Sequence, residues 1–331
     1  MNRPPRLPGI LFALAAGLMW GLVFVGPLLL PEYPASVQTF GRYLAFGLIA
    51  LPLAWFDRRS LRLLTRADWV EALKLALVGN IVYYLLLASA IQRAGGPLPT
   101  VIIGTLPVVI AVTTKLRRAL PGARVEAPLA WRRMLPSLGL IGLGIGLVNH
   151  VELDQLRRQP NVDLARYGLG ALLAAGAVLC WTWYPIRNAE WLRAHPGRSP
   201  RGWATAQGLA TLPLALFGYA ATWLWHAGTG AAFAMPFGPR VADFLLLMFA
   251  IGLFASWLGT LCWNEASQRL PPALSGQLIV FETLAALGYA LALRGGWPPV
   301  ETLVGVGLLV AGVVWAVRTQ PSPASADAHP N

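Results

Sequence analysis

The stretch LVGNIVYYLLLASAIQRAGGPLPTVIIGTLP, Leu77–Pro107, decides the fold of this 331-residue chain. It predicts an apolar helix, a tight turn built on glycine and proline, and a second apolar helix. One stripe of the first helix has i, i+3, i+4, i+7 spacing, which places its members on a common face: Asn80, Tyr83, Tyr84 and Leu87. Polar side chains therefore line one side of a helix that is otherwise apolar.

The same design returns 176 positions later as FASWLGTLCWNEASQRLPPALSGQLIVFET, Phe254–Thr283. The stripe returns with it, at Ser256, Thr260 and Trp263. A duplicated helix pair with a polar stripe, set in very apolar sequence, indicates two membrane repeats that face a shared polar space.

Composition places the chain among proteins that cross a lipid bilayer several times. Hydrophobic residues make up 56% of the sequence and charged residues 12%, whereas a soluble domain carries about 25% charge. The net charge of +12 raises nucleic acid as a partner, but the arginines sit in short clusters between apolar runs, as membrane topology signals do. Cysteines and histidines show no metal-ligand spacing. We expect a bilayer around the chain, no nucleic acid, and no metal or other cofactor.

Apolar runs long enough to cross a bilayer, about 20 residues each, occur ten times along the chain. They fall at 9–30, 35–56, 70–92, 97–115, 134–150, 167–188, 203–225, 242–267, 272–293 and 299–318. Ten spans in two copies give five per repeat, and an odd number inserts the second copy upside down relative to the first.

The predicted fold is therefore an all-α integral membrane protein with ten transmembrane helices, arranged as two inverted five-helix repeats around a central cavity. The first repeat covers 1–153 and the second 154–319. The segment 320–331, rich in proline, serine and alanine, is expected to be a disordered tail.

The distribution of basic residues predicts the orientation in the membrane. With the first end inside, 18 arginines and lysines fall in inner loops and 6 in outer loops. Cytoplasmic loops carry the excess of positive charge, so both termini and the tail are predicted to be cytoplasmic. The loop 151–166 is then predicted to be outside the cell.

Short motifs in a family's order and spacing run from residue 9 to residue 318. LAAGLMWGLVFV at Leu14–Val25 contains a first-helix Leu-x-Trp-Gly pattern, and GRYLAFG at Gly41–Gly47 is a second-helix arginine segment. LLAAGAVLCWTWY at Leu172–Tyr184 opens the second repeat, and Trp263-Asn264 belongs to an eighth-helix Trp-Asn-x-Ala motif. Together they resemble the drug/metabolite transporter superfamily in its ten-helix EamA form.

The resemblance implies a secondary transporter of the inner (plasma) membrane that exports small metabolites by alternating access. The Trp-Asn pair and the aromatic interior look most like bacterial exporters of aromatic and other neutral amino acids; the alternative is a drug or other metabolite transporter of the same fold. The sequence departs from the family at Glu282-Thr283, where the ninth helix usually reads Glu-Pro, which argues against a proline kink there.

The candidate substrate-binding residues are aromatic, hydroxyl and amide side chains near the middle of the predicted spans. Tyr83 and Tyr84 are about 100° apart on their helix, so one can face the cavity while the other packs. Trp20 and Trp181 match between the repeats, and Trp183 is the alternative to Trp181. The full set is Trp20, Asn80, Tyr83, Tyr84, Trp181, Trp183, Ser256, Thr260 and Trp263. These side chains suit a small amphiphilic molecule better than a sugar phosphate, which calls for buried arginine or lysine.

Two charged residues lie well inside predicted spans. Glu282 is near the centre of the ninth span, where a charge is costly, so it is either protonated, paired or in contact with water. It is a candidate for proton coupling or for binding a substrate amine, with a structural hydrogen bond as the alternative. Arg42 is a candidate for attracting a carboxylate, but its place in the second span favours a side chain that extends to the outer surface.

Two other function classes are disfavoured by the sequence. No phosphate loop, nucleophile elbow or paired carboxylates are found, so an enzyme is not expected. A channel is typically lined by rings of like residues or an open polar path, and the aromatic stripe is neither. The sequence does not predict the oligomeric state.

Overall fold

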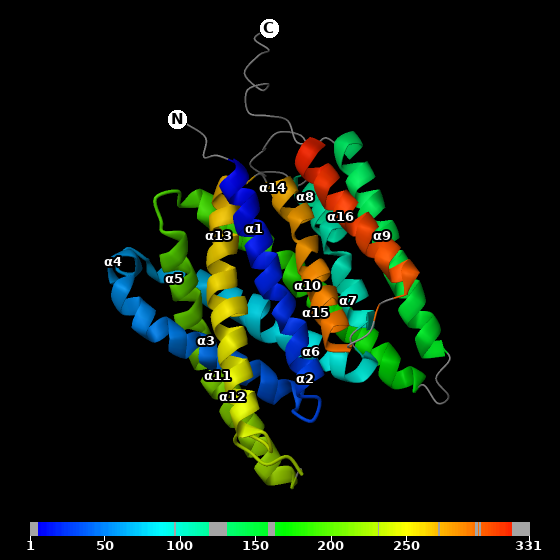
Figure 1. Cartoon of the computed structure of the whole chain (residues 1–331). Helices are drawn as coiled ribbons and strands as arrows, with labels where there is room; N and C mark the ends of the chain where they lie inside the picture. Colours follow the sequence, from blue (N-terminus) through cyan, green and yellow to red (C-terminus); the bar gives the residue numbers. More distant parts are fainter. Residues whose placement is uncertain are drawn as a thin grey trace.

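The computed structural model describes residues 6–95, 97–118, 131–157, 163–230, 232–270, 272–294, 297 and 299–319. Every regular element in these ranges is a helix (Figure 1). Apolar sequence in a bilayer favours this architecture because a helix satisfies its backbone hydrogen bonds within one segment. The predicted tail, 320–331, lies outside the described residues.

The helices follow one another along the chain with short connections. Up to residue 157 they are α1 (Arg6–Gly21), η1 (Leu22–Phe24), α2 (Val25–Leu29), α3 (Ala35–Phe56), α4 (Arg58–Leu61), α5 (Arg66–Leu75), η2 (Ala76–Val82), α6 (Tyr83–Ala94), α7 (Pro97–Gly104), α8 (Leu106–Arg118) and α9 (Trp131–Arg157). They continue with α10 (Leu164–Ala194), α11 (Pro200–Thr229), α12 (Val241–Ile251), η3 (Gly252–Leu258), α13 (Gly259–Arg269), α14 (Pro272–Leu278), α15 (Val280–Arg294) and α16 (Val300–Thr319).

Several of these elements join into stretches of membrane-spanning length. Seven stretches are long and apolar enough to cross a bilayer: Leu7–Leu29, Ala35–Phe56, Arg66–Ala94, Leu164–Ala194, Pro200–Thr229, Val241–Arg269 and Leu274–Leu293. Three shorter apolar helices are Leu98–Ile110, Leu135–Val148 and Val300–Ala316. All ten overlap predicted spans. The all-α membrane fold is confirmed, while the count of ten crossings and the inverted repeat stay predictions.

Helices from the two predicted repeats pack against each other. The most extensive contacts join α9 to α16, α3 to α11 and α6 to α10, and α1 lies against both α13 and α15 (Figure 1). Each of these pairs takes one helix from the first predicted repeat and one from the second. The two halves therefore bury their apolar faces mainly against each other.

The third and eighth predicted spans each contain a π-helical segment. These segments, Ala76–Val82 and Gly252–Leu258, are separated by 176 positions, the offset that relates the two sequence copies. Within the first one, Gly79 lies so close to α10 that a Cβ atom on it would overlap the ring of Tyr184. π-Helical turns are rare and are found frequently at functional sites, which directs attention to the space beside both segments.

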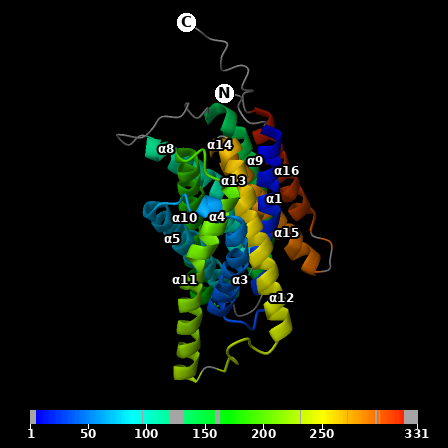
Figure 2. The ribbon, with the colours of Figure 1, turned by 90° about the vertical axis from the view of Figure 1, so that its left-hand side faces the viewer.

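The interior is rich in aromatic rings, whereas the outer surface is apolar. The largest fully buried side chains include Trp203, Tyr43 and Tyr184. Leu224 and Leu246, from α11 and α12, are among the large apolar residues exposed on the outside. The far end of the α11–α12 pair extends beyond the rest of the bundle in both views (Figure 2). An exposed apolar exterior is what helices present to lipid tails.

The predicted orientation is tested by cysteine labelling at the two ends of α11. Gly197 precedes this helix, Gly228 lies near its end, and both are exposed. In a background where Cys180 and Cys262 are replaced by alanine, we expect Gly228→Cys to react with a membrane-impermeant maleimide in whole cells. Gly197→Cys is expected to react only after permeabilisation, because its arginine-rich loop is predicted to be cytoplasmic. The reverse pattern would contradict the predicted topology.

Candidate functional site

A cavity lies among the helices of both halves, beside the two π-helical segments. Its lining residues are Trp20, Val23, Arg42, Tyr43, Gly79, Asn80, Tyr83, Trp181, Ala255, Ser256, Thr260 and Glu282. Its free volume is about 10 Å³, which is enough for about one water molecule. The structure therefore represents a contracted form of the site.

The cavity brings together most of the residues that were predicted to bind substrate. Trp20, Asn80, Tyr83, Trp181, Ser256 and Thr260 line it, and so does Glu282. Tyr84, Trp183 and Trp263 are not among its lining residues. Sequence spacing thus selected residues from several distant spans that meet at one place. Their role in binding a substrate stays a prediction.

The two adjacent tyrosines separate as their helical angle requires. Tyr83 lines the cavity, whereas the hydroxyl of Tyr84 donates a hydrogen bond to the carbonyl oxygen of Val23 at 3.1 Å. The ring of Tyr84 also lies beneath the guanidinium of Arg42, with 4.5 Å between the guanidinium carbon and the ring centre. Tyr84 therefore supports the cavity wall from behind.

Glu282 is the acidic residue of this cavity and is 1% exposed. Each of its carboxylate oxygens accepts one hydrogen bond. The indole nitrogen of Trp181 donates to Oε2 at 3.0 Å, and the hydroxyl of Tyr83 donates to Oε1 at 3.3 Å. These bonds tie α15 to α10 and α6. Glu282 therefore does bond neighbouring helices, and both oxygens keep acceptor capacity for a proton or a ligand.

Stacked rings form the wall beside Glu282. Trp181 stacks on Tyr83 at 4.5 Å and on Tyr184 at 5.0 Å between ring centres. Trp20 meets the edge of Trp181 at 4.9 Å and lies 5.1 Å from Trp263. Trp263 is buried behind Trp20, and Trp183 is half-buried. Trp181 is therefore the centre of the aromatic wall, and the alternative residue Trp183 does not line the cavity.

The expectation that Arg42 extends to the outer surface is wrong. Arg42 is 4% exposed, lines the cavity, and donates from Nε to the hydroxyl oxygen of Ser256 at 3.0 Å. Its helix α3 is packed between α11 and α12 and against η3, so the side chain points into the protein. The cavity therefore contains a buried cation, which the sequence pattern had not led us to expect.

Four further lining residues, Val23, Tyr43, Gly79 and Ala255, were not predicted from the sequence. A signal for Tyr43 was available. Gln38, Thr39, Arg42 and Tyr43 recur at i, i+3, i+4 spacing in α3, and all four are buried. That polar stripe marks the inward face of the second span. The apolar and glycine positions carry no comparable signal.

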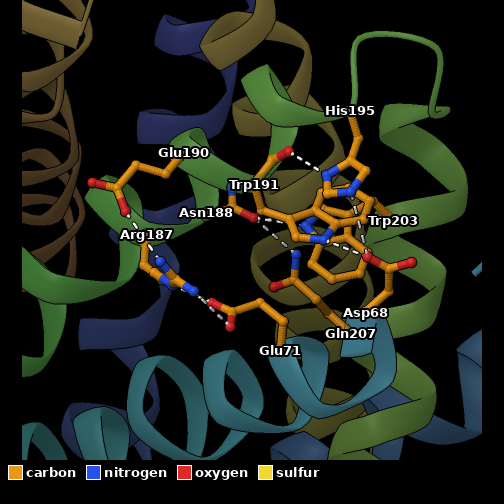
Figure 3. Close-up of polar contacts among 9 residues, drawn as sticks. All are labelled: Asp68, Glu71, Arg187, Asn188, Glu190, Trp191, His195, Trp203 and Gln207. Carbon is orange, nitrogen blue, oxygen red and sulfur yellow. Dashed lines mark hydrogen bonds and ion pairs between the residues drawn. The ribbon is translucent and has the colours of Figure 1, made fainter. Parts of the chain in front are cut away.

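A cluster of polar contacts, drawn in Figure 3, connects α10 and α11 with α5 away from the cavity lining. Its best-connected member is Asn188, which is 0% exposed. The amide oxygen of Asn188 accepts from Trp203 Nε1 at 2.9 Å and from Gln207 Nε2 at 3.2 Å (Figure 3). Its amide nitrogen donates to Asn264 Oδ1 at 2.8 Å. This polar cluster holds three spans together.

Charged groups of the polar cluster join α10 to α5. Arg187 forms an ion pair with Glu71, with Nε 2.5 Å from Oε1 (Figure 3). One turn further along α10, the indole of Trp191 donates to Asp68 Oδ1 at 2.9 Å. These residues come from spans three and six, at the ends predicted to face the cytoplasm. The cluster is connected to the aromatic wall through Tyr184, whose hydroxyl donates to Gln207 Oε1 at 2.8 Å.

Metal chemistry finds no support in the part of the chain that the structure describes. No group of three or more histidine, cysteine, aspartate or glutamate side chains is placed to hold a metal ion there. Both cysteines are free thiols in half-buried positions on α10 and α13.

Comparisons with known proteins agree with this picture of a membrane protein. A solved structure described as "Crystal structure of protein" has a TM-score of 0.66 and 18% identity, covering 95% of this chain and 99% of that one. At this identity the likeness shows the fold alone. The inner membrane protein YtfF of Escherichia coli strain K12 is 53% identical over 315 residues, which is 95% of this chain and 96% of the relative.

The description of the matching protein family adds a function to the fold. Residues 7–117, which contain the first polar stripe, Arg42 and Trp20, match the EamA-like transporter family. The relative from Escherichia coli extends the similarity over nearly the whole chain. This chain is a membrane transporter and belongs to the EamA-like transporter family of the drug/metabolite transporter superfamily.

Proposed function

We propose that this transporter exports neutral amino acids, aromatic ones foremost, across the inner membrane by alternating access. The observation that carries the proposal is the cavity between the two halves, where Tyr83, Trp181 and Trp20 form an aromatic wall beside the polar groups of Asn80 and Glu282. Broad apolar rings with a few placed polar groups suit a small amphiphilic molecule.

The size of the cavity supports a cycle that alternates between conformations. A space for about one water cannot hold an amino acid, so binding requires the surrounding helices to move apart. The polar cluster of Figure 3 bridges spans three and six at the ends predicted to be cytoplasmic. Separation of α5 from α10 at this place would connect the cavity to the cytoplasm. No nucleotide-binding motif is present in the sequence, so ion gradients or exchange would drive the cycle.

The proposal is tested with the purified chain in liposomes. Efflux of radiolabelled phenylalanine, tryptophan, leucine, alanine, a nucleotide sugar and a cationic drug is measured with and without a pH gradient. We expect saturable flux for the neutral amino acids, fastest for the aromatic ones. Flux restricted to the drug or the nucleotide sugar would favour the alternative substrate classes, and flux without saturation would favour a channel.

Trp181 provides a test of the aromatic wall. We expect Trp181→Ala to weaken transport of phenylalanine and tryptophan about tenfold and transport of alanine much less, because a lost ring contact costs about 0.5–1.5 kcal/mol. Trp181→Phe keeps a ring but removes the hydrogen bond to Glu282, which separates the two contributions. Trp225→Ala is the matched control, since that indole is 69% exposed. Equal losses for aromatic substrates and alanine would remove the ring wall from the binding site.

A further inference from the structure

We propose that Arg42 binds the carboxylate group of the transported molecule. The proposal rests on the function proposed above and narrows it: the substrates of this cavity are small molecules with one free carboxylate, and Arg42 selects for that group. The sequence pattern favoured the outer surface for this side chain, so the assignment depends on the tertiary structure.

Arg42 is a buried cation with an unused donor. It is 4% exposed, and its Nη1 has no hydrogen-bond partner within the described part of the chain. No carboxylate among the described residues forms an ion pair with it; Glu282 lines the same cavity but is bonded to Trp181 and Tyr83 instead. A buried guanidinium without a paired carboxylate is costly. An anion that enters the cavity would offset that cost.

The neighbours of the guanidinium hold it in place without using all of its N–H groups. The rings of Tyr43 and Tyr84 lie 4.7 and 4.5 Å from its central carbon, which stabilises the cation and occupies none of its donors. Ser256 accepts from Nε, and the hydroxyl of Tyr84 is itself fixed on Val23. The fork is thus positioned while Nη1 stays available. Pre-organised donors of this kind match the two oxygens of a carboxylate.

The charges of the cavity limit the charge of the molecule that it can accept. Among the described lining residues Arg42 is the one cation, and Glu282 is the one acid. A phosphate ester with two negative charges would meet one arginine and be repelled by an ionised Glu282. A single carboxylate is balanced by one guanidinium, and the rest of the molecule then faces the aromatic wall. This charge balance favours amino acids over sugar phosphates.

The experiment compares phenylalanine with phenethylamine, which keeps the ring and the amine but lacks the carboxylate. Both are measured as flux and as thermal stabilisation of the purified protein, in wild type, Arg42→Gln, Arg42→Lys and the control Arg93→Gln, whose arginine is exposed on α6. We expect wild type to prefer phenylalanine. Arg42→Gln should weaken phenylalanine about ten- to hundredfold, as expected for a hydrogen bond to a charged group, and leave phenethylamine unchanged or improved. Arg42→Lys should be intermediate, and Arg93→Gln should match wild type.

The outcomes separate this inference from the proposed function. If wild type handles both probes equally well, or Arg42→Gln weakens both equally, the carboxylate role is overturned while amino acid transport stands. If wild type responds to neither probe, both proposals fail for aromatic amino acids. If Arg42→Gln does not fold, the comparison of the two probes in wild type and Arg42→Lys still decides the question.

Discussion

The Glu282→Gln variant is expected to transport phenylalanine at a rate that no longer responds to a pH gradient. Glu282 is buried beside the aromatic wall, where its charged form is expensive and a proton is readily exchanged with a substrate-bound state. Glutamine has nearly the same shape but cannot release a proton. Transport measured in liposomes with and without an imposed gradient should therefore differ in wild type and be equal in the variant.

The same substitution should leave the fold and substrate binding largely intact. The amide oxygen of glutamine can still accept from Trp181, and the hydroxyl of Tyr83 can turn to accept from the amide nitrogen. Glu282→Leu is the contrasting variant, because it leaves two buried donors without partners at about 1–3 kcal/mol each. A coupling that survives Glu282→Gln, or a wild type that ignores the gradient, would dismiss the proton role and leave Glu282 a structural residue.

Asn188→Leu is expected to cause the largest loss of stability. It removes three hydrogen bonds between α10, α11 and α13, made with Trp203, Gln207 and Asn264. Hydrogen bonds between membrane helices contribute about 0.6–1.7 kcal/mol each, so the variant should lose about 2–5 kcal/mol. In detergent the apparent melting temperature should fall by about 5–15 °C, measured as the fraction that remains monodisperse after heating.

Glu71→Gln is the control for Asn188→Leu within the same polar cluster. Its partner Arg187 has 43% of its side chain exposed, and ion pairs with solvent access contribute about 0–1 kcal/mol. Glutamine also keeps an oxygen that accepts from Arg187. We therefore expect a shift of at most a few degrees. A Glu71→Gln loss as large as that of Asn188→Leu would mean that the ion pair, not the buried amide, holds these spans together.

The fold class was predictable because local pattern carries it. Apolar runs of membrane-spanning length must be helical in a bilayer, and the seven long stretches with their three shorter companions fall on the predicted positions. The helical period also placed Asn80 and Tyr83 on one face, and the 176-residue offset linked that face to Ser256 and Thr260. These residues could be grouped before their contacts were known because the periodic face of a helix is a local property.

The tertiary structure decided what local pattern could not. The choice between Tyr83 and Tyr84, and between Trp181 and Trp183, depends on which neighbouring helix occupies each side. Arg42 was misplaced because the snorkelling rule considers depth along a single helix, whereas the packing of α3 against α11, α12 and η3 turns this residue inward. The sequence by itself determined the helices and their polar faces. Packing between helices distant in the chain determined which side chains share the cavity, because such contacts leave no periodic trace in either partner alone.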